Sequence, residues 1–149
     1  MAAKRRPSRA LLDVNVLIAL LDAGHIHHRR ASSWLAEHIE SGWASCAITQ
    51  NGCIRIMSQP AYPGALPAAE VAARLASAAA MPQHAFIPAD LSLLDEARFD
   101  RSQLLGHRQI TDAWLLGVAV QHGLRFVTLD AALPWRAVRG ALPAHAVNL

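Results

Sequence analysis

The sequence contains little cysteine and no long apolar run. Cys46 and Cys53 are its only cysteines among 149 residues. Two are too few for a disulfide framework, and their spacing does not form a C-x-x-C redox pair, so we expect both thiols in the core. No apolar stretch approaches the roughly 20 residues of a membrane span. The first apolar stretch is interrupted by Asp13, Asn15 and Asp22, which does not suit a signal peptide. We therefore expect a cytoplasmic protein without a membrane partner.

Lysine is almost absent as well. Lys4 is the single lysine among 14 lysines and arginines, and the net charge is +3 with a pI near 9.5. The planar guanidinium group of arginine matches phosphate geometry, so this composition is compatible with nucleic-acid binding. A genome biased toward arginine codons would give the same excess of arginine over lysine. The charge therefore permits a nucleic-acid partner without requiring one.

Short apolar runs alternate with segments of helical periodicity. The hydrophobic fraction of 53% and the length suit one globular domain, which we place at residues 9–149 after a basic tail at residues 1–8. We expect strands at 9–13, 43–48, 85–87, 124–129 and 146–149. Helices are expected at 15–21, 28–41, 49–58, 67–80, 91–99 and 109–122, with Thr49 as an N-cap and Gly123 after the last. This alternation predicts the α/β class, with a mostly parallel central sheet flanked by helices.

Three acids stand where solvated charges are not expected. Asp13 ends the first buried strand and Asp130 ends the fourth. Ligands of open parallel sheets bind outside the carboxyl ends of the strands, so both acids should face one crevice. Asp112 lies in the first turn of the helix at 109–122, on the same face as Leu115 and Leu116. This apolar face should turn Asp112 toward the core.

Converging carboxylates repel one another unless a cation compensates them. Oxygen ligands alone select hard ions, here Mg²⁺ or Mn²⁺. Each acid also has a purely structural explanation: Asp112 at a helix N-terminus, Asp13 as a cap, and Asp130 in a turn. Their joint placement favours a site.

Three segments resemble the motifs of a known family. Leu11-Leu-Asp-Val-Asn-Val-Leu-Ile-Ala-Leu20 resembles the opening strand and D-x-N motif of PIN domains. Gly106-His-Arg-Gln-Ile-Thr-Asp-Ala-Trp-Leu-Leu116 and Gly123-Leu-Arg-Phe-Val-Thr-Leu-Asp130 resemble their third and fourth acidic motifs. From about Arg9 to Leu133, the chain is similar to the VapC-type ribonuclease toxins of toxin–antitoxin pairs.

The resemblance implies a compact α/β endoribonuclease that acts on RNA with Mg²⁺ or Mn²⁺. It also implies a homodimer that a small antitoxin protein inhibits, with an antitoxin segment lying near the acidic crevice. Carried over to this chain, the resemblance makes Asp13 and Asp112 the metal ligands, and Asp130 the third catalytic acid. Asn15 and Thr128 would be polar support for these acids.

One position departs from the family pattern. The family usually carries a glutamate on the second helix, where this chain reads Ile48-Thr-Gln-Asn-Gly52, so Gln50 stands in place of the acid. An amide oxygen is neutral, and we expect weaker metal binding. The alternative is a catalytically weak or inactive PIN scaffold that binds RNA or protein. A haloacid-dehalogenase phosphatase is disfavoured, because Asn15 stands where its second aspartate is required.

Other polar and aromatic positions have two interpretations. His107-Arg108-Gln109 precedes the helix of Asp112 and either contacts a phosphate or base at the rim of the pocket or is a polar helix entry. Arg136 and Arg139 are expected on a solvated face. Trp34 and Trp114 lie on apolar helical faces, and we expect them in the core instead of at a base-stacking surface.

Overall fold

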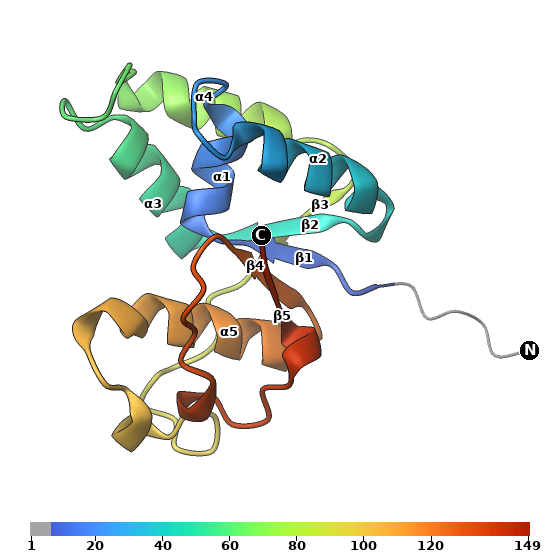
Figure 1. Cartoon of the computed structure of the whole chain (residues 1–149), viewed down its shortest axis with the longest axis vertical. Helices are drawn as coiled ribbons and strands as arrows, with labels where there is room; N and C mark the ends of the chain where they lie inside the picture. Colours follow the sequence, from blue (N-terminus) through green and yellow to red (C-terminus); the bar gives the residue numbers. More distant parts are fainter. Residues whose placement is uncertain (1–6) are drawn as a thin grey trace, which may run out of the picture.

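The computed structural model of the chain describes residues 7–149 and contains a five-stranded, fully parallel sheet. The strands are β1 (Ala10–Leu12), β2 (Trp43–Cys46), β3 (His84–Ile87), β4 (Arg125–Thr128) and β5 (Ala146–Asn148), in the order β3-β2-β1-β4-β5 (Figure 1). Crossover connections join parallel neighbours, which explains the alternation in the sequence. The α/β class is confirmed. Most of the expected basic tail, residues 1–6, lies outside the described residues.

Helices cover both faces of this sheet. The first four are α1 (Val14–Leu21), α2 (His28–His38), α3 (Ala47–Met57) and α4 (Ala68–Ala79), and α5 is Ile110–His122. In Figure 1 the first four lie above the sheet and α5 lies below it. Gly123 ends α5 with a left-handed φ of 65°, as its position after the helix predicts. No helix within residues 7–149 has the length and apolarity to cross a bilayer.

The order of the strands creates a switch point at β1. The chain runs outward from β1 through β2 to β3, and then returns along the other face, through α5, to β4 on the opposite side of β1. Crossovers that leave a sheet in opposite directions open a crevice between the carboxyl ends of the two strands concerned. That crevice lies where β1 and β4 end.

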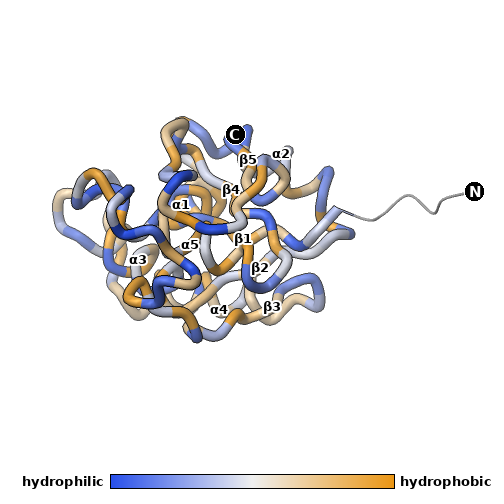
Figure 2. The backbone as a smooth tube through the Cα atoms, turned by 90° about the horizontal axis from the view of Figure 1, so that it is seen from below, coloured by the Kyte–Doolittle hydropathy of each residue, from blue (hydrophilic) through white to orange (hydrophobic). Residues whose placement is uncertain are grey.

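Two hydrophobic layers hold the sheet between the helices. Leu11 packs with the residues of α5, whereas Ala10 and Leu12 pack with those of α1 to α4, as the alternation of a strand requires. Hydrophobic positions gather along the central strands, and many hydrophilic stretches lie at the periphery (Figure 2). Both cysteines are buried, as expected, and burial raises the pKa of the Cys53 thiol to about 11.

Two sequence-based expectations are wrong. The segment 91–99 forms turns and no helix, because the Ser92 and Asp95 side chains accept hydrogen bonds from backbone N–H groups two residues ahead. Such local bonds compete with helix formation. Helix α3 begins at Ala47 and not after Thr49. Cys46 is its N-cap residue, and the Thr49 hydroxyl accepts the Cys46 N–H at 3.0 Å from the third helical position.

Candidate metal centre

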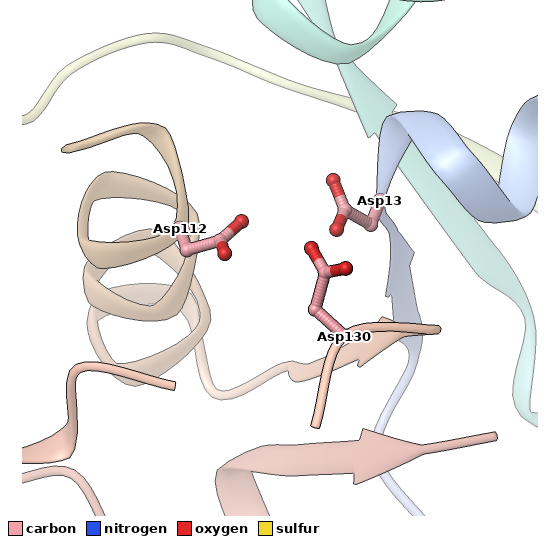
Figure 3. A group of neighbouring side chains, drawn as sticks. All are labelled: Asp13, Asp112 and Asp130. Atoms are coloured by element: carbon pink, nitrogen blue, oxygen red, sulfur yellow. The ribbon is translucent and has the colours of Figure 1, made fainter. Parts of the chain in front are cut away.

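The three predicted acids meet at the switch point. Asp13 directly follows β1, Asp130 lies two residues after β4, and Asp112 lies in the first turn of α5. One carboxylate oxygen of each lies within 4.8 Å of the others, and Figure 3 shows the side chains pointing toward one another. Within residues 7–149 this is the only such cluster of three or more histidine, cysteine or acidic side chains. The predicted convergence of the three acids is present.

Asp13 is held rigidly and is 5% exposed. Its Oδ1 accepts the Val14 N–H at 2.7 Å, and its Oδ2 accepts the Thr128 hydroxyl at 2.7 Å. Its backbone carbonyl accepts the N–H groups of Val16 and Leu17, which starts α1. Asp13 is therefore a helix cap and a member of the acidic cluster at the same time, and the two explanations do not compete.

Thr128 connects the ends of β1 and β4. Its hydroxyl donates to Asp13 and accepts the Asp130 N–H at 3.1 Å. Asn15 Oδ1 accepts the Leu129 N–H at 3.3 Å, and its Nδ2 lies 3.5 Å from the Thr128 hydroxyl. The polar support expected of Asn15 and Thr128 is thus present, and it fixes the turn that carries Asp130.

Asn148 adds a support that sequence reasoning missed. Its Nδ2, on β5, donates to the backbone carbonyl of Asp130 at 2.8 Å. An asparagine near the end of a short expected strand carries no signal of this kind in the sequence. Only the pairing of β5 with β4 brings it beside the Asp130 turn.

The cluster is electrostatically strained without a cation. Burial, followed by the charges of Asp13 and Asp130, raises the pKa of Asp112 to about 7. Burial also raises the pKa of Asp13, against the opposing effect of its hydrogen bonds from Thr128 and Val14. Burial and like charge both disfavour the ionised form of a carboxyl group. A hard divalent cation among these oxygens would remove that cost, so the donor set fits Mg²⁺ or Mn²⁺.

Asp112 and Asp130 line a solvent-accessible hollow of about 480 Å³, and the buried Asp13 lies behind them. Its walls are formed by the start of α5 and the chain after β4: Arg108, Gln109, Asp112, Asp130, Ala131 and Ala132. Two residues of the expected rim segment, Arg108 and Gln109, therefore do lie at the pocket. A guanidinium group beside converging carboxylates supplies a positive charge that a phosphate group can contact.

The structure does not bring Gln50 to this hollow. The Gln50 amide Nε2 donates to the Ser45 hydroxyl at 3.0 Å, and that hydroxyl is 2.8 Å from His84 Nε2. Ser45 alternates with Ala44, which packs on the α5 side, so Ser45 faces the layer of α1 to α4. Gln50 lines a separate hollow against α4, together with Ala72 and Ala76. The sequence pattern correctly predicted that Gln50 lies on a helix, here α3. It did not reveal which face of the sheet the Gln50 amide contacts.

Comparison with known proteins gives this geometry a family. A family model described as the PIN domain matches residues 10–139. Ribonuclease VapC44 of Mycobacterium tuberculosis is 50% identical over 141 residues, which cover 95% of this chain and 99% of the relative. Ribonuclease VapC38 of the same organism is 40% identical over 125 residues, 83% of this chain and 86% of the relative. The chain, with its fully parallel sheet and its acids at the ends of β1 and β4, therefore belongs to the PIN-domain family, among the VapC-type ribonucleases.

Proposed function

We propose that the protein is a metal-dependent endoribonuclease that hydrolyses phosphodiester bonds of RNA as the toxin of a toxin–antitoxin pair. The observation that carries the proposal is the meeting of three carboxylates within 4.8 Å, two of which, Asp112 and Asp130, line a solvent-accessible hollow together with Arg108. The names of the similar VapC ribonucleases support the same activity. Asp13, Asp112 and Asp130 are the proposed catalytic residues, within a PIN domain at residues 9–149.

Asp13 and Asp112 are the proposed ligands of Mg²⁺ or Mn²⁺. A bound divalent ion in such a site lowers the pKa of water and neutralises charge that develops on a phosphate. Thr128 and the Val14 N–H hold the Asp13 carboxylate in one orientation, so little ordering remains for binding. Asp130 adds a third negative charge at the exposed side of the cluster. Arg108 binds a phosphate group of the RNA chain, and no side-chain nucleophile is needed.

The test is cleavage of RNA by purified protein with added Mg²⁺ or Mn²⁺, with RNA 5′ ends mapped after the reaction. Asp13→Asn and Asp112→Asn should abolish cleavage while the fold persists, because an amide removes a ligand charge at nearly constant volume. Asp90→Asn is the matched control, since Asp90 is exposed and pairs with His122. Cleavage by Asp13→Asn or Asp112→Asn at the wild-type rate would exclude that residue as a ligand.

An inactive scaffold that binds RNA or protein is the second candidate. The observation that favours it is Gln50, because the side chain that stands in place of the family's glutamate is bonded to Ser45 and adds no charge to the cluster. RNA binding without cleavage, at every Mg²⁺ and Mn²⁺ concentration, would support the scaffold and contradict the enzyme.

We also propose a homodimer in the cytoplasm that a small antitoxin protein restrains. A bidentate contact between an antitoxin arginine and Asp13 or Asp130 would compete with metal binding, because guanidinium–carboxylate pairs are strong. Light scattering of the purified protein tests the dimer. Growth of cells that express the chain without a partner tests the restraint: arrest is expected, and normal growth would contradict the toxin role.

A further inference from the structure

A second hollow adjoins the acidic one. It has a volume of about 360 Å³, and its walls include Gln103, Leu105, Gln109, Leu133, Trp135 and Arg136. Gln109 lines both hollows. The chain after β4 also runs along both, with residues 130–132 at the acids and residues 133–136 at the second hollow. A molecule that reaches the acids therefore has the second hollow directly beside it.

Two exposed apolar side chains, Trp135 and Leu105, line this second hollow. Trp135 is 37% exposed, which makes it the most exposed of the four tryptophans, whereas Trp43 and Trp114 are 5% and 7% exposed. Leu105 is 81% exposed. Large apolar side chains left open to water next to a polar site indicate a binding surface more than a packing role. A flat indole ring suits a flat aromatic ligand.

Side chains with N–H donors, which carboxylates lack, also line the second hollow. Gln109 Oε1 accepts the Leu105 N–H at 3.1 Å, which fixes the amide and leaves its N–H donors for another acceptor. Gln103 supplies a second amide, and Arg136, expected on a solvated face, brings an exposed guanidinium group to the rim. Amides and guanidinium groups are the side chains that pair with the edges of nucleobases.

We infer that the second hollow is a subsite for one unpaired nucleobase of the RNA substrate, next to the phosphate that the acids engage. Trp135 stacks on the base, Gln103 and Gln109 contact its edge, and Arg136 contacts a flanking phosphate. The base must be unpaired, because a base inside a duplex is stacked on both faces and offers no face to an indole ring. The inference rests on the proposed RNA substrate. It adds Trp135 as a residue that selects the position at which the RNA is cut.

A single-stranded RNA of twelve nucleotides, with the base removed at one position at a time, tests the subsite. With the wild type, one abasic position near the cut should lower kcat/KM about 10-fold, the effect of losing one base–aromatic stack. Trp135→Leu keeps an apolar side chain without an aromatic ring. This variant should show the 10-fold loss on intact RNA and no further loss with the abasic substrate. Trp135→Tyr should restore most of the rate, and Phe86→Leu, at an exposed phenylalanine on β3, should change nothing.

A measurement of RNA binding tests the nucleobase subsite separately from the proposed nuclease activity. Tryptophan fluorescence of the wild type should be quenched by the same RNA in Mg²⁺, and the quenching should be lost in Trp135→Leu. Quenching without cleavage would contradict the proposed nuclease and keep the subsite. Cleavage by Trp135→Leu at wild-type rate and with an unchanged choice of cut sites would overturn the subsite and keep the nuclease.

Discussion

At the scale of single residues, Thr128 has the most consequential hydrogen bonds in the site. Its one hydroxyl hydrogen is used on Asp13, so the Asp130 N–H must be accepted by the oxygen of the same group. One side chain thus sets the orientation of a proposed ligand and the path of the turn that carries the next acid. Groups that orient metal ligands in this way strongly affect affinity.

Thr128→Val removes that hydroxyl at nearly constant shape. We expect apparent Mg²⁺ affinity to fall about 10- to 100-fold, the usual range for loss of a group that orients a ligand. The free energy of unfolding should fall by about 1–3 kcal/mol, because the buried Asp13 carboxylate and the partly buried Asp130 N–H both lose their partner. Metal titration and thermal melting measure both. Thr128→Ser, which keeps the hydroxyl, should retain the wild-type affinity; equal affinity in all three proteins would contradict a positioning role.

Gln50 gives a second prediction at this scale. A carboxylate cannot donate, so in Gln50→Glu the Ser45 hydroxyl would donate to the new side chain. Ser45 could then only accept from His84 Nε2, which requires a hydrogen on that nitrogen, and the added carboxylate charge nearby favours the protonated ring. Burial lowers the pKa of His84 in the wild type, and Gln50→Glu should raise it, as followed by NMR titration. Mg²⁺ affinity should stay unchanged. Tighter Mg²⁺ binding in the variant would show that this side chain does reach the acids.

The sequence predicted the acids well for a physical reason. Asp13 and Asp130 follow buried strands, and parallel strands bring their carboxyl ends to one edge, so strand prediction alone nearly fixes their meeting. Gln50 and Trp135 lack such a constraint. The orientation of the Gln50 amide depends on its contact with Ser45 on β2, which in turn contacts His84 on β3. Trp135 stands out only when its exposure beside Gln109 is known.

At the scale of elements, α1 and α3 pack unusually closely at one glycine. A Cβ atom added to Gly52 would lie 2.8 Å from a methyl carbon of Val14, the residue that follows Asp13. The start of α1 is therefore held by α3 as well as by its own cap. In the segment 91–99, by contrast, local hydrogen bonds outweigh the sequence pattern. Its apolar spacing suits a helix, but the Ser92 and Asp95 side chains accept backbone N–H groups and form turns.

Gly52→Ala tests this close approach. Alanine in place of glycine inside a helix usually stabilises by about 0.5–1 kcal/mol. Here we expect destabilisation of about 1–3 kcal/mol, because the added methyl group overpacks the contact. Denaturant unfolding measures the change. In a Val14→Ala background, Gly52→Ala should cost much less stability than in the wild type, because alanine lacks the methyl carbon that the new Cβ would meet. An equal cost in both backgrounds would exclude the contact as the cause.

At the scale of the whole molecule, the acidic cluster should make stability depend on pH. The pKa of Asp112 is about 7 in the folded protein, against an ordinary value of 3.8. Between these values the folded chain keeps a proton that the unfolded chain has lost, so stability falls as pH rises from 3.8 toward 7. The raised pKa of Asp13 acts in the same direction.

Melting temperatures across this pH range measure the dependence. The metal-free wild type should lose stability toward neutral pH, while Asp112→Asn should show a flatter profile and a higher melting temperature at pH 7. Added Mg²⁺ should restore wild-type stability at pH 7 by binding the ionised form, with little effect on Asp112→Asn. Wild type and variant profiles that run parallel would show that the cluster does not set the pH response.

The pairing of β5 with β4 has a consequence for the order in which the protein becomes functional during synthesis. Asp13 is synthesised first, Asp112 and Asp130 follow 99 and 117 residues later, and Asn148 on β5 then fixes the Asp130 turn. A nascent chain therefore carries an incomplete set of acids until residue 130 has been added. Fragments released before residue 148 lack this support for the Asp130 turn, so we expect them to bind Mg²⁺ more weakly than the full chain.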